Sequence, residues 1–158
     1  MACLGAKATI YFPKTVSQNK RERVKIWGAE TVVFGDDIDQ ALKEASAQAE
    51  VKNLTYVHPF ADPHIIAGQG TLALEILEDQ PDIDTIIVAI GGGGLSSGVA
   101  TAAKAINPNI KIIGVEPVGA PTLYESCKAG HIIQLEQVKT DALTMAISTT
   151  SDINFEIK

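Results

Sequence analysis

The run Thr85-Ile86-Ile87-Val88-Ala89-Ile90-Gly91-Gly92-Gly93-Gly94 carries the strongest structural signal in the chain. Residues 85–90 are solidly apolar after the first one, which predicts a buried strand. Residues 95–106 are rich in alanine and predict a helix, and residues 111–116 predict a second strand after a turn. A strand, a helix and a strand in this order are typical of an α/β protein with a parallel sheet and helices on both faces.

The four consecutive glycines indicate a place where bare backbone is needed. Each glycine loses more backbone entropy on ordering than any other residue, so a run of four is costly. Successive N–H groups at the start of a helix form a concave nest for an anion, and a phosphate group is its natural guest. Ser96 and Ser97 are expected to add hydroxyl donors. The alternative is a tight turn packed against a neighbour, for which one or two glycines suffice.

Two well-known nucleotide loops do not fit these residues. A P-loop needs a lysine where this chain has Val99, and a dinucleotide loop needs a last glycine where it has Ser96 or Ser97. Glu116 ends the next predicted strand, close to where an acid would hold a ribose hydroxyl. A nucleotide-binding Rossmann-like module therefore stays open as an alternative.

The chain before the glycines predicts further strands and helices. Ser17 is expected to cap the first helix, which Gly28 ends, and Asp62-Pro63 is expected to start another helix. The boundary between two lobes is expected where prolines and glycines cluster between residues 58 and 70, which gives lobes of residues 1–64 and 65–158. The predicted strands are residues 8–12, 30–34 and 53–57, and the other predicted helices are residues 18–27, 38–51 and 120–130.

Composition narrows the class of protein. The chain has 158 residues, of which 46% are hydrophobic and 20% charged, with a formal net charge of −6. This excludes a mainly disordered chain and argues against a nucleic-acid partner, and no apolar run approaches the roughly 20 residues of a membrane span. Two distant cysteines and a start without signal-peptide features predict a reducing, cytoplasmic location. The basic residues 20–25 are interpreted as a solvated helix face.

Five other segments of the sequence form a distinctive set with the glycines: His58-Pro59-Phe60-Ala61-Asp62-Pro63, Ile66-Ala67-Gly68-Gln69-Gly70-Thr71, Leu74-Glu75-Ile76, Gly114-Val115-Glu116-Pro117 and Tyr124-Glu125-Ser126. Together with Gly91-Gly92-Gly93-Gly94-Leu95 they resemble the threonine/serine ammonia-lyases (dehydratases) and the related serine racemases. These are pyridoxal-phosphate enzymes of the tryptophan-synthase-β fold (fold type II). The resemblance runs from about residue 2 to about residue 140.

The resemblance implies that residues 1–64 are part of a small lobe that covers the cofactor, and that residues 65–158 are part of the large lobe that binds it. It also implies roles for particular residues. Residues Gly91 to Gly94, with Leu95, would hold the phosphate of pyridoxal 5'-phosphate. Glu116 lies where some members place a divalent-cation ligand, and Ala120 matches a backbone-carbonyl ligand of that site. Thr122 stands where those members have an acid, so the pattern is incomplete. The other interpretation of Glu116 is a carboxylate that ends a strand or caps a helix.

The resemblance also shows what this chain lacks. The family's Ser-x-Lys-x-Arg-Gly segment, which supplies the Schiff-base lysine, is absent, and so is the Ser-Gly-Asn-His loop that holds the substrate carboxylate. No other lysine stands in an apolar context. The chain therefore looks like the truncated middle of an enzyme, and we expect no turnover from the chain alone.

The reaction implied for the full family is the conversion of L-threonine to 2-oxobutanoate and ammonia, or of L-serine to pyruvate and ammonia. Two other interpretations stay open: a non-catalytic phosphate- or pyridoxal-phosphate-binding pseudoenzyme, and a truncated reading frame without activity. A parallel sheet without all its strands exposes open edges and apolar faces. We therefore expect self-association or pairing with a full-length relative.

Overall fold

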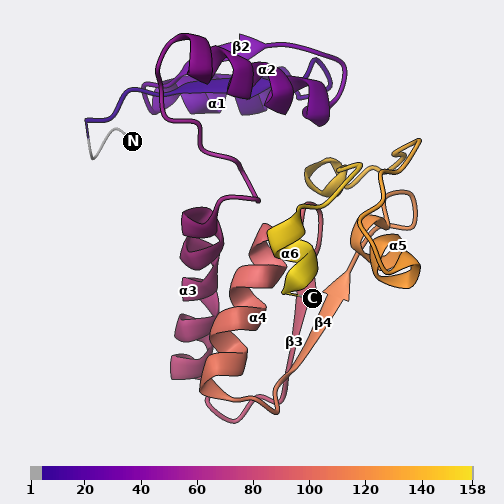
Figure 1. The fold of residues 1–158 in the computed structure, drawn as a ribbon. Coiled ribbons are helices and arrows are strands. Elements are labelled where there is room, and N and C mark those ends of the chain that lie inside the picture. Colours follow the sequence, from indigo (N-terminus) through magenta and orange to yellow (C-terminus); the bar gives the residue numbers. More distant parts are fainter. Residues whose placement is uncertain (1–4, 158) are drawn as a thin grey trace. The chain divides into compact units, whose positions relative to one another are not determined.

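The computed structural model of the chain describes residues 5–157 and divides into two compact units (Figure 1). The first unit ends at Tyr56 and the second begins at Val57. Residues 57–64 therefore belong to the second unit, although the sequence placed them in the first lobe. The assignment of residues 1–64 to a cofactor-covering lobe stays a prediction.

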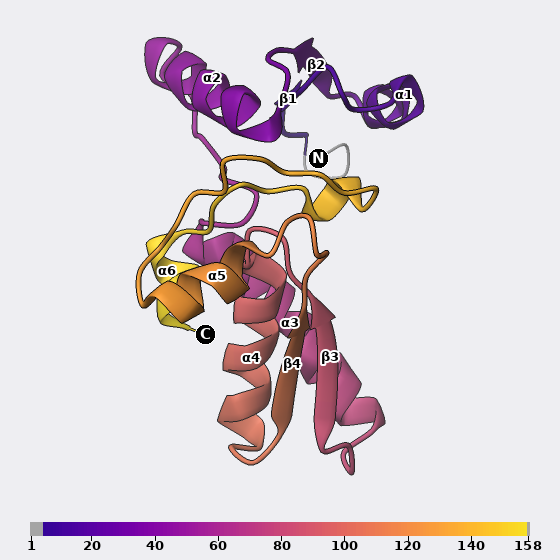
Figure 2. The same ribbon diagram turned by 90° about the vertical axis from the view of Figure 1, so that its right-hand side faces the viewer.

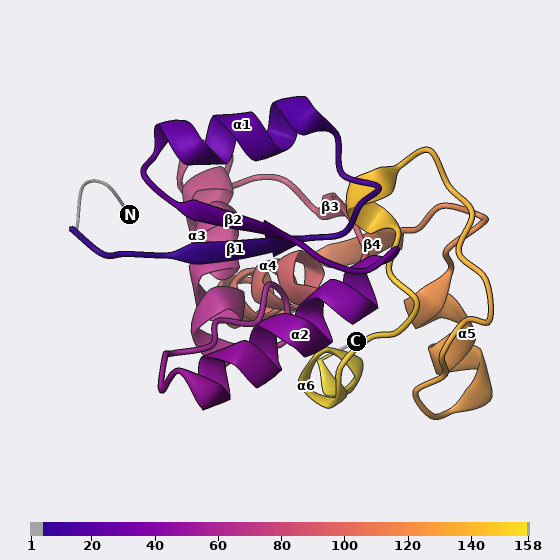
Figure 3. The same ribbon diagram turned by 90° about the horizontal axis from the view of Figure 1, so that it is seen from above.

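The first unit is built on two parallel strands, β1 (Thr9–Phe12) and β2 (Glu30–Val33). Their register pairs Thr9 with Glu30 and Phe12 with Val33. Helix α1 (Gln18–Ile26) connects the strands, and α2 (Ile38–Val51) follows them. Figure 3 shows the two helices on opposite sides of the strand pair. These bounds confirm the predicted elements to within about one residue.

The two helices of this unit begin differently. Asp37 caps α2, because its carboxylate accepts a hydrogen bond from the backbone N–H of Gln40 at 2.8 Å. Ser17 occupies the N-cap position of α1 as predicted, but its side chain makes no cap hydrogen bond with the described residues. Gly28 ends the helix as expected, in the left-handed region with a φ of 78°.

Residues 53–57 do not form the predicted third strand. Asn53 has a positive φ of 53° and Leu54 donates its N–H to the carbonyl of Ala49, so these residues close α2 instead. A strand needs a hydrogen-bonded partner, and no described strand lies beside this segment. Leu54 and Val57 are accordingly exposed, and the β-branched composition of the segment was a misleading signal.

The second unit contains the strand–helix–strand arrangement that the sequence predicted. Strands β3 (Thr85–Ala89) and β4 (Lys111–Val115) are parallel, and α4 (Gly94–Ile106) connects them. Figure 2 shows the two strands side by side, with α4 and α3 (Pro63–Asp79) packed behind them. The remaining elements are α5 (Thr122–Ala129), the 3₁₀ helix η2 (Leu143–Met145) and α6 (Asp152–Glu156).

The core of this unit lies between α3, α4 and the inner face of the strands. It consists of Ala73, Leu77, Ile86, Val99, Ala103 and Ile110. Gly70 and Gly98 let the two helices approach closely: a Cβ atom on Gly98 would overlap the carbonyl oxygen of Ile66 and lie 2.7 Å from the nitrogen of Gly70. Contact between backbones therefore requires glycine at position 98.

The outer face of β3 and β4 is apolar and bare. Ile87 is 68% exposed, and Ile113 and Val115 on β4 are nearly half exposed. Neither outer edge of the strand pair bonds to another strand within residues 5–157. An open face of this kind was expected from the sequence. No helix in the described part of the chain is long and apolar enough to cross a membrane.

Candidate functional site: the glycine loop

The glycine loop, residues 91–94, joins β3 to α4. The ladder of the strand pair extends to Ile90, whose N–H donates to the carbonyl of Val115 at 2.9 Å. The chain then turns through Gly93, which has a φ of 99°, and α4 begins at Gly94. A residue with a Cβ is strained at that angle, so the turn itself requires glycine at position 93.

The loop and the first turn of α4 present a series of unused donors. No described residue accepts a hydrogen bond from the backbone N–H groups of residues 91–96. Gly92, Gly93 and Gly94 are nevertheless buried. A buried N–H group without an acceptor costs stability, so this part of the fold is suited to an external anion. The partial positive charge at the start of α4 adds to the attraction.

Each glycine of the loop also lies against a neighbour. A Cβ atom on Gly92 would overlap the ring of Phe60, and one on Gly94 would lie 2.9 Å from the Cα and carbonyl oxygen of Phe60. On Gly93 it would lie 2.9 Å from the Cβ of Asn154, and on Gly91 3.2 Å from the Cα of Met145. Close packing against neighbours therefore accounts for all four glycines, whereas the sequence analysis expected a packed turn to need only one or two.

The hydroxyl of Ser96 does not take the role that the sequence suggested. The hydroxyl of Ser96 donates to the carbonyl oxygen of Gly93 at 2.9 Å and is buried. Ser97 contributes its backbone, whose N–H donates to the same carbonyl at 2.9 Å. Ser96 therefore stabilises the start of α4, whereas a donor role for the hydroxyl of Ser97 stays a prediction.

Phe60 is held in place by its neighbour His58. The Nδ1 atom of His58 accepts the backbone N–H groups of Phe60 and Ala61, at 3.3 and 3.0 Å, and the two rings meet edge to face. Burial lowers the pKa of His58, and the nearby carboxylate of Asp62 opposes this effect. Both observations favour the neutral imidazole with its proton on Nε2.

Two polar residues near the C-terminal end reach the glycine loop, and the sequence analysis missed both. The hydroxyl of Thr150 donates to the carbonyl oxygen of Gly92 at 3.0 Å. The side-chain amide of Asn154 donates to the same oxygen at 2.9 Å and to that of Phe60 at 2.8 Å. These partners lie far from the loop in sequence, and no local pattern marks them. The short helix α6 that carries Asn154 was not predicted either.

The residues proposed for a cation are engaged in other bonds. Both carboxylate oxygens of Glu116 accept backbone N–H groups at the start of α5, from Leu123 and Tyr124 at 2.8 Å each. Thr122 donates its hydroxyl to the carbonyl oxygen of Ile147 at 2.6 Å, and Ala120 is buried. The described residues contain no group of three or more His, Cys, Asp or Glu side chains able to hold a metal. The cation site stays a prediction.

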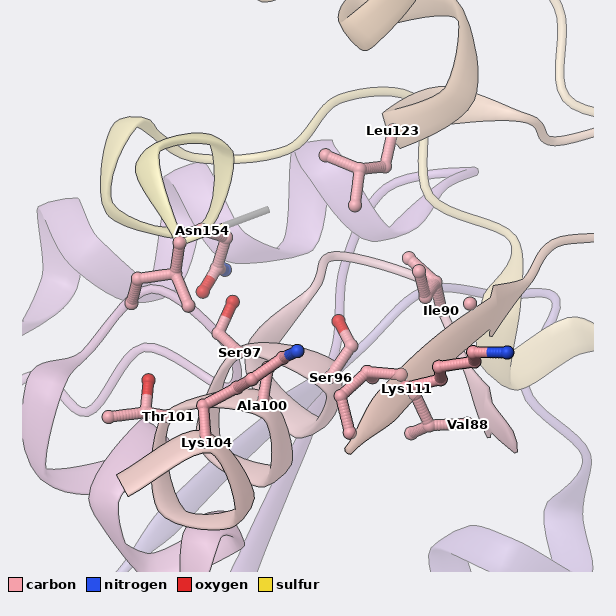
Figure 4. Close-up of a pocket in the computed structure, with 13 residues that line it drawn as sticks. Val88, Ile90, Ser96, Ser97, Ala100, Thr101, Lys104, Lys111, Leu123 and Asn154 are labelled. Atoms are coloured by element: carbon pink, nitrogen blue, oxygen red, sulfur yellow. The ribbon is translucent and has the colours of Figure 1, made fainter. Parts of the chain in front are cut away.

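A cavity of about 700 Å³ lies beside α4 on the side of β4 and α6 (Figure 4). Its walls are mainly apolar, with Val88 on β3, Ile90 directly after β3 and Leu123 on α5. Figure 4 shows Ser96, Ser97 and Lys104 on the side of α4, Asn154 on α6 above them, and Lys111 on the side of β4. Every lysine among residues 5–157 is exposed. Of the cysteines, Cys127 is exposed, and Cys3 lies outside the described residues.

The fold and the loop define a class: an α/β protein in which a glycine-rich turn after a parallel strand presents N–H groups at the start of a helix. The family model described as pyridoxal-phosphate dependent enzyme matches residues 1–157. The chain therefore belongs to this family, whose cofactor is pyridoxal 5'-phosphate. This result favours the resemblance seen in the sequence over a Rossmann-like module.

Particular members of the family are similar over nearly the whole chain. An L-threonine ammonia-lyase of Thermotoga maritima is 39% identical over 97% of this chain and 38% of its own length. Maize serine racemase matches with a TM-score of 0.90 and 38% identity, over 99% of this chain and 48% of its own. A threonine deaminase from Solanum lycopersicum matches with a TM-score of 0.89 and 40% identity, over 98% of this chain and 45% of the length of the deaminase. The chain thus spans less than half the length of each.

Proposed function

We propose that this chain is part of a pyridoxal-phosphate-dependent threonine/serine dehydratase, and that the backbone N–H groups of residues 91–95 hold the phosphate of the cofactor. The observation that carries the proposal is that the backbone N–H groups of residues 91–95 have no acceptor among the described residues, although Gly92, Gly93 and Gly94 are buried. The similarity to threonine ammonia-lyases and threonine deaminase supports the substrate class, L-threonine or L-serine.

The residues of the chain would bind and orient the cofactor, and the cofactor would supply the reactive group. When bound, pyridoxal phosphate provides an electron sink for negative charge that develops on the amino-acid substrate. The loop N–H groups and the helix N-terminus neutralise the phosphate, because they point donors and a partial positive charge at one place. Phe60, held by His58 and Asn154, limits the space on one side of the loop.

The first test separates phosphate binding from binding of the pyridoxal ring. The chain is titrated with pyridoxal phosphate, with pyridoxal, which lacks the phosphate, and with inorganic phosphate. We expect pyridoxal phosphate and phosphate to raise the melting temperature, and pyridoxal to bind at least about tenfold more weakly than pyridoxal phosphate. Equal binding of the two pyridoxal compounds, or no stabilisation by phosphate, would contradict the proposed role of the loop.

A glycine pair provides matched variants for this titration. Gly94→Ala places a Cβ 2.9 Å from the backbone of Phe60 and is expected to abolish phosphate stabilisation. Gly28→Ala changes a glycine of the first unit that has open space around it and serves as the control. If both variants respond to phosphate as the parent chain does, the binding site lies elsewhere.

We further propose that the chain alone does not turn over substrate. The exposure of every lysine among residues 5–157 supports this, because no ammonium group in this part of the chain is desolvated enough to become a good nucleophile. Reduction with borohydride in the presence of pyridoxal phosphate, followed by mass spectrometry, is expected to give no single stoichiometric lysine adduct. One such adduct, or steady formation of 2-oxobutanoate from L-threonine, would contradict the proposal.

The bare face of β3 and β4 supports a further part of the proposal, namely that the chain associates with a second copy or with a longer relative. Binding of pyridoxal phosphate without turnover in any such assembly would favour the non-catalytic module over the dehydratase. A cytoplasmic location and the absence of a nucleic-acid partner stay predictions from composition.

A further inference from the structure

The side chain of Asn154 is a buried link between three segments of the second unit. It is 1% exposed, although asparagine is usually found at the surface. Both hydrogen atoms of its amide are used, one toward Phe60 and one toward Gly92. Its own N–H donates to the hydroxyl of Ser151 at 3.4 Å, which orients the first turn of α6.

The bond to Gly92 determines more than the position of one carbonyl. Gly92 O accepts from both Asn154 and Thr150, so its direction is fixed by two donors. The peptide that joins Gly92 to Gly93 is planar and trans, so the N–H of Gly93 points opposite to the carbonyl of Gly92. Holding that carbonyl toward α6 therefore turns the N–H of Gly93 away from α6.

The same side chain also leaves little freedom to the neighbouring residues. A Cβ atom on Gly93 would lie 2.9 Å from the Cβ of Asn154, so the loop and α6 are in direct contact. The second amide bond holds the carbonyl of Phe60, whose backbone lies equally close to Gly94. Asn154 thus restrains the glycine loop at its turn and, through Phe60, at the start of α4.

We propose that Asn154 is the positioning residue that sets the direction of the N–H groups of the glycine loop for a phosphate ligand. The inference rests on the proposed function, because that function supplies the phosphate. The orientation of the loop is nevertheless a property of the chain without ligand. It can therefore be tested even if phosphate does not bind.

The test compares Asn154→Leu, which has a similar volume and no donors, with two controls. Ser126→Ala removes another fully buried hydrogen-bonding side chain of the second unit, away from the loop. Glu156→Ala changes an exposed residue of α6 itself. The amide ¹H–¹⁵N signals of Gly92, Gly93 and Gly94 are recorded without ligand, and phosphate affinity is then measured by ³¹P titration.

We expect Asn154→Leu to shift or broaden the three glycine signals and to weaken phosphate binding at least about tenfold. Ser126→Ala is expected to lower the melting temperature while leaving the glycine signals in place, which separates lost stability from lost orientation. Unchanged glycine signals in Asn154→Leu, or the same shifts in Ser126→Ala, would overturn the inference.

Two milder variants keep the test decisive if Asn154→Leu does not fold. Asn154→Ser retains a hydroxyl too short to reach both carbonyls, and Thr150→Val removes the other donor to Gly92. Both are expected to move the same glycine signals by smaller amounts, and unmoved signals would overturn the inference. If the parent chain binds no phosphate while the glycine signals still respond to Asn154, the proposed function fails and the positioning role stands.

Discussion

The chain contains the same topological module twice, and only one copy presents a candidate site. In each, two parallel strands are joined by a helix: β1–α1–β2 in the first unit and β3–α4–β4 in the second. Helix α1 has no buried residue, whereas α4 buries Ser97, Val99 and Ala103 among others. The turn before α1 contains Pro13 and side chains of ordinary size, and the turn before α4 is four glycines.

This difference shows that topology alone does not make a binding site. The turn before α4 needs glycine because Phe60 and Asn154 press against it, and the side chains of Thr150 and Asn154 hold the carbonyl of its Gly92. In the turn before α1, by contrast, the backbone N–H of Lys14 has an acceptor, the carbonyl oxygen of Gly35 at 3.0 Å. The following predictions test this comparison, in order of decreasing effect.

The largest effect is expected where α4 contacts α3. Gly98→Ala forces a methyl group against the backbone of Ile66 and Gly70, so the helices must separate, at a cost of about 3 kcal/mol in free energy of unfolding. Gly28→Ala, after α1, meets no atom within 4 Å and costs only about 1 kcal/mol for its left-handed backbone. Urea denaturation followed by circular dichroism measures both. Equal costs would mean that the two helices are packed alike.

An intermediate effect is expected at the helix starts of the first unit. Asp37→Ala removes the cap of α2 and is expected to cost about 1 kcal/mol, whereas Ser17→Ala removes no cap bond and should be nearly neutral. The fluorescence of Trp27, the single tryptophan of the chain, reports unfolding of this unit. A cost for Ser17→Ala as large as that for Asp37→Ala would show that α1 has a cap after all.

A substitution on the bare face of β3 and β4 is expected to have a smaller effect on stability but a clear effect on self-association. Ile87→Lys places a charge on the bare face of β3 and β4 and should change the free energy of unfolding by no more than about 0.5 kcal/mol. Analytical ultracentrifugation is expected to show less self-association than in the parent chain. Val51→Lys, at a still more exposed site on α2, is the control, and an equal reduction of self-association in that variant would argue against the face of β3 and β4 as the interface.

The smallest effect concerns the pH dependence that His58 confers. Its pKa is lowered in the folded state, so the unfolded chain takes up a proton first as the pH falls below the ordinary value of 6.5. The stabilisation is therefore present above that pH and is lost as the pH falls through the lowered pKa. His58→Gln should reduce the loss of melting temperature between pH 7 and pH 5, and the exposed His64→Gln should not. An unchanged profile in His58→Gln would show that Nδ1 does not hold the Phe60 segment.

Much of the fold and part of the site were predictable from local sequence. The bounds of α2 and the start of α3 at Asp62-Pro63 were predicted correctly, because capping residues and helical periodicity act over a few neighbours. The predicted strand at residues 53–57 is wrong, and Ser17 occupies the predicted N-cap position without a cap hydrogen bond, for a related reason. A β-branched segment becomes a strand only beside a partner, and a serine caps a helix only if its hydroxyl turns inward.

The sequence by itself determined the class of the protein, the strand–helix–strand order and the position of the glycine loop, because these depend on hydrophobic runs and on glycines that stand next to one another. Only the tertiary structure decided which neighbours require those glycines and which donors orient the loop. Phe60, Thr150 and Asn154 lie more than about thirty residues from the loop, and the contacts they make depend on how α3, α4 and α6 pack. Such contacts leave no periodic trace in the sequence, since any polar side chain at position 154 would look the same before folding brings it to Gly92.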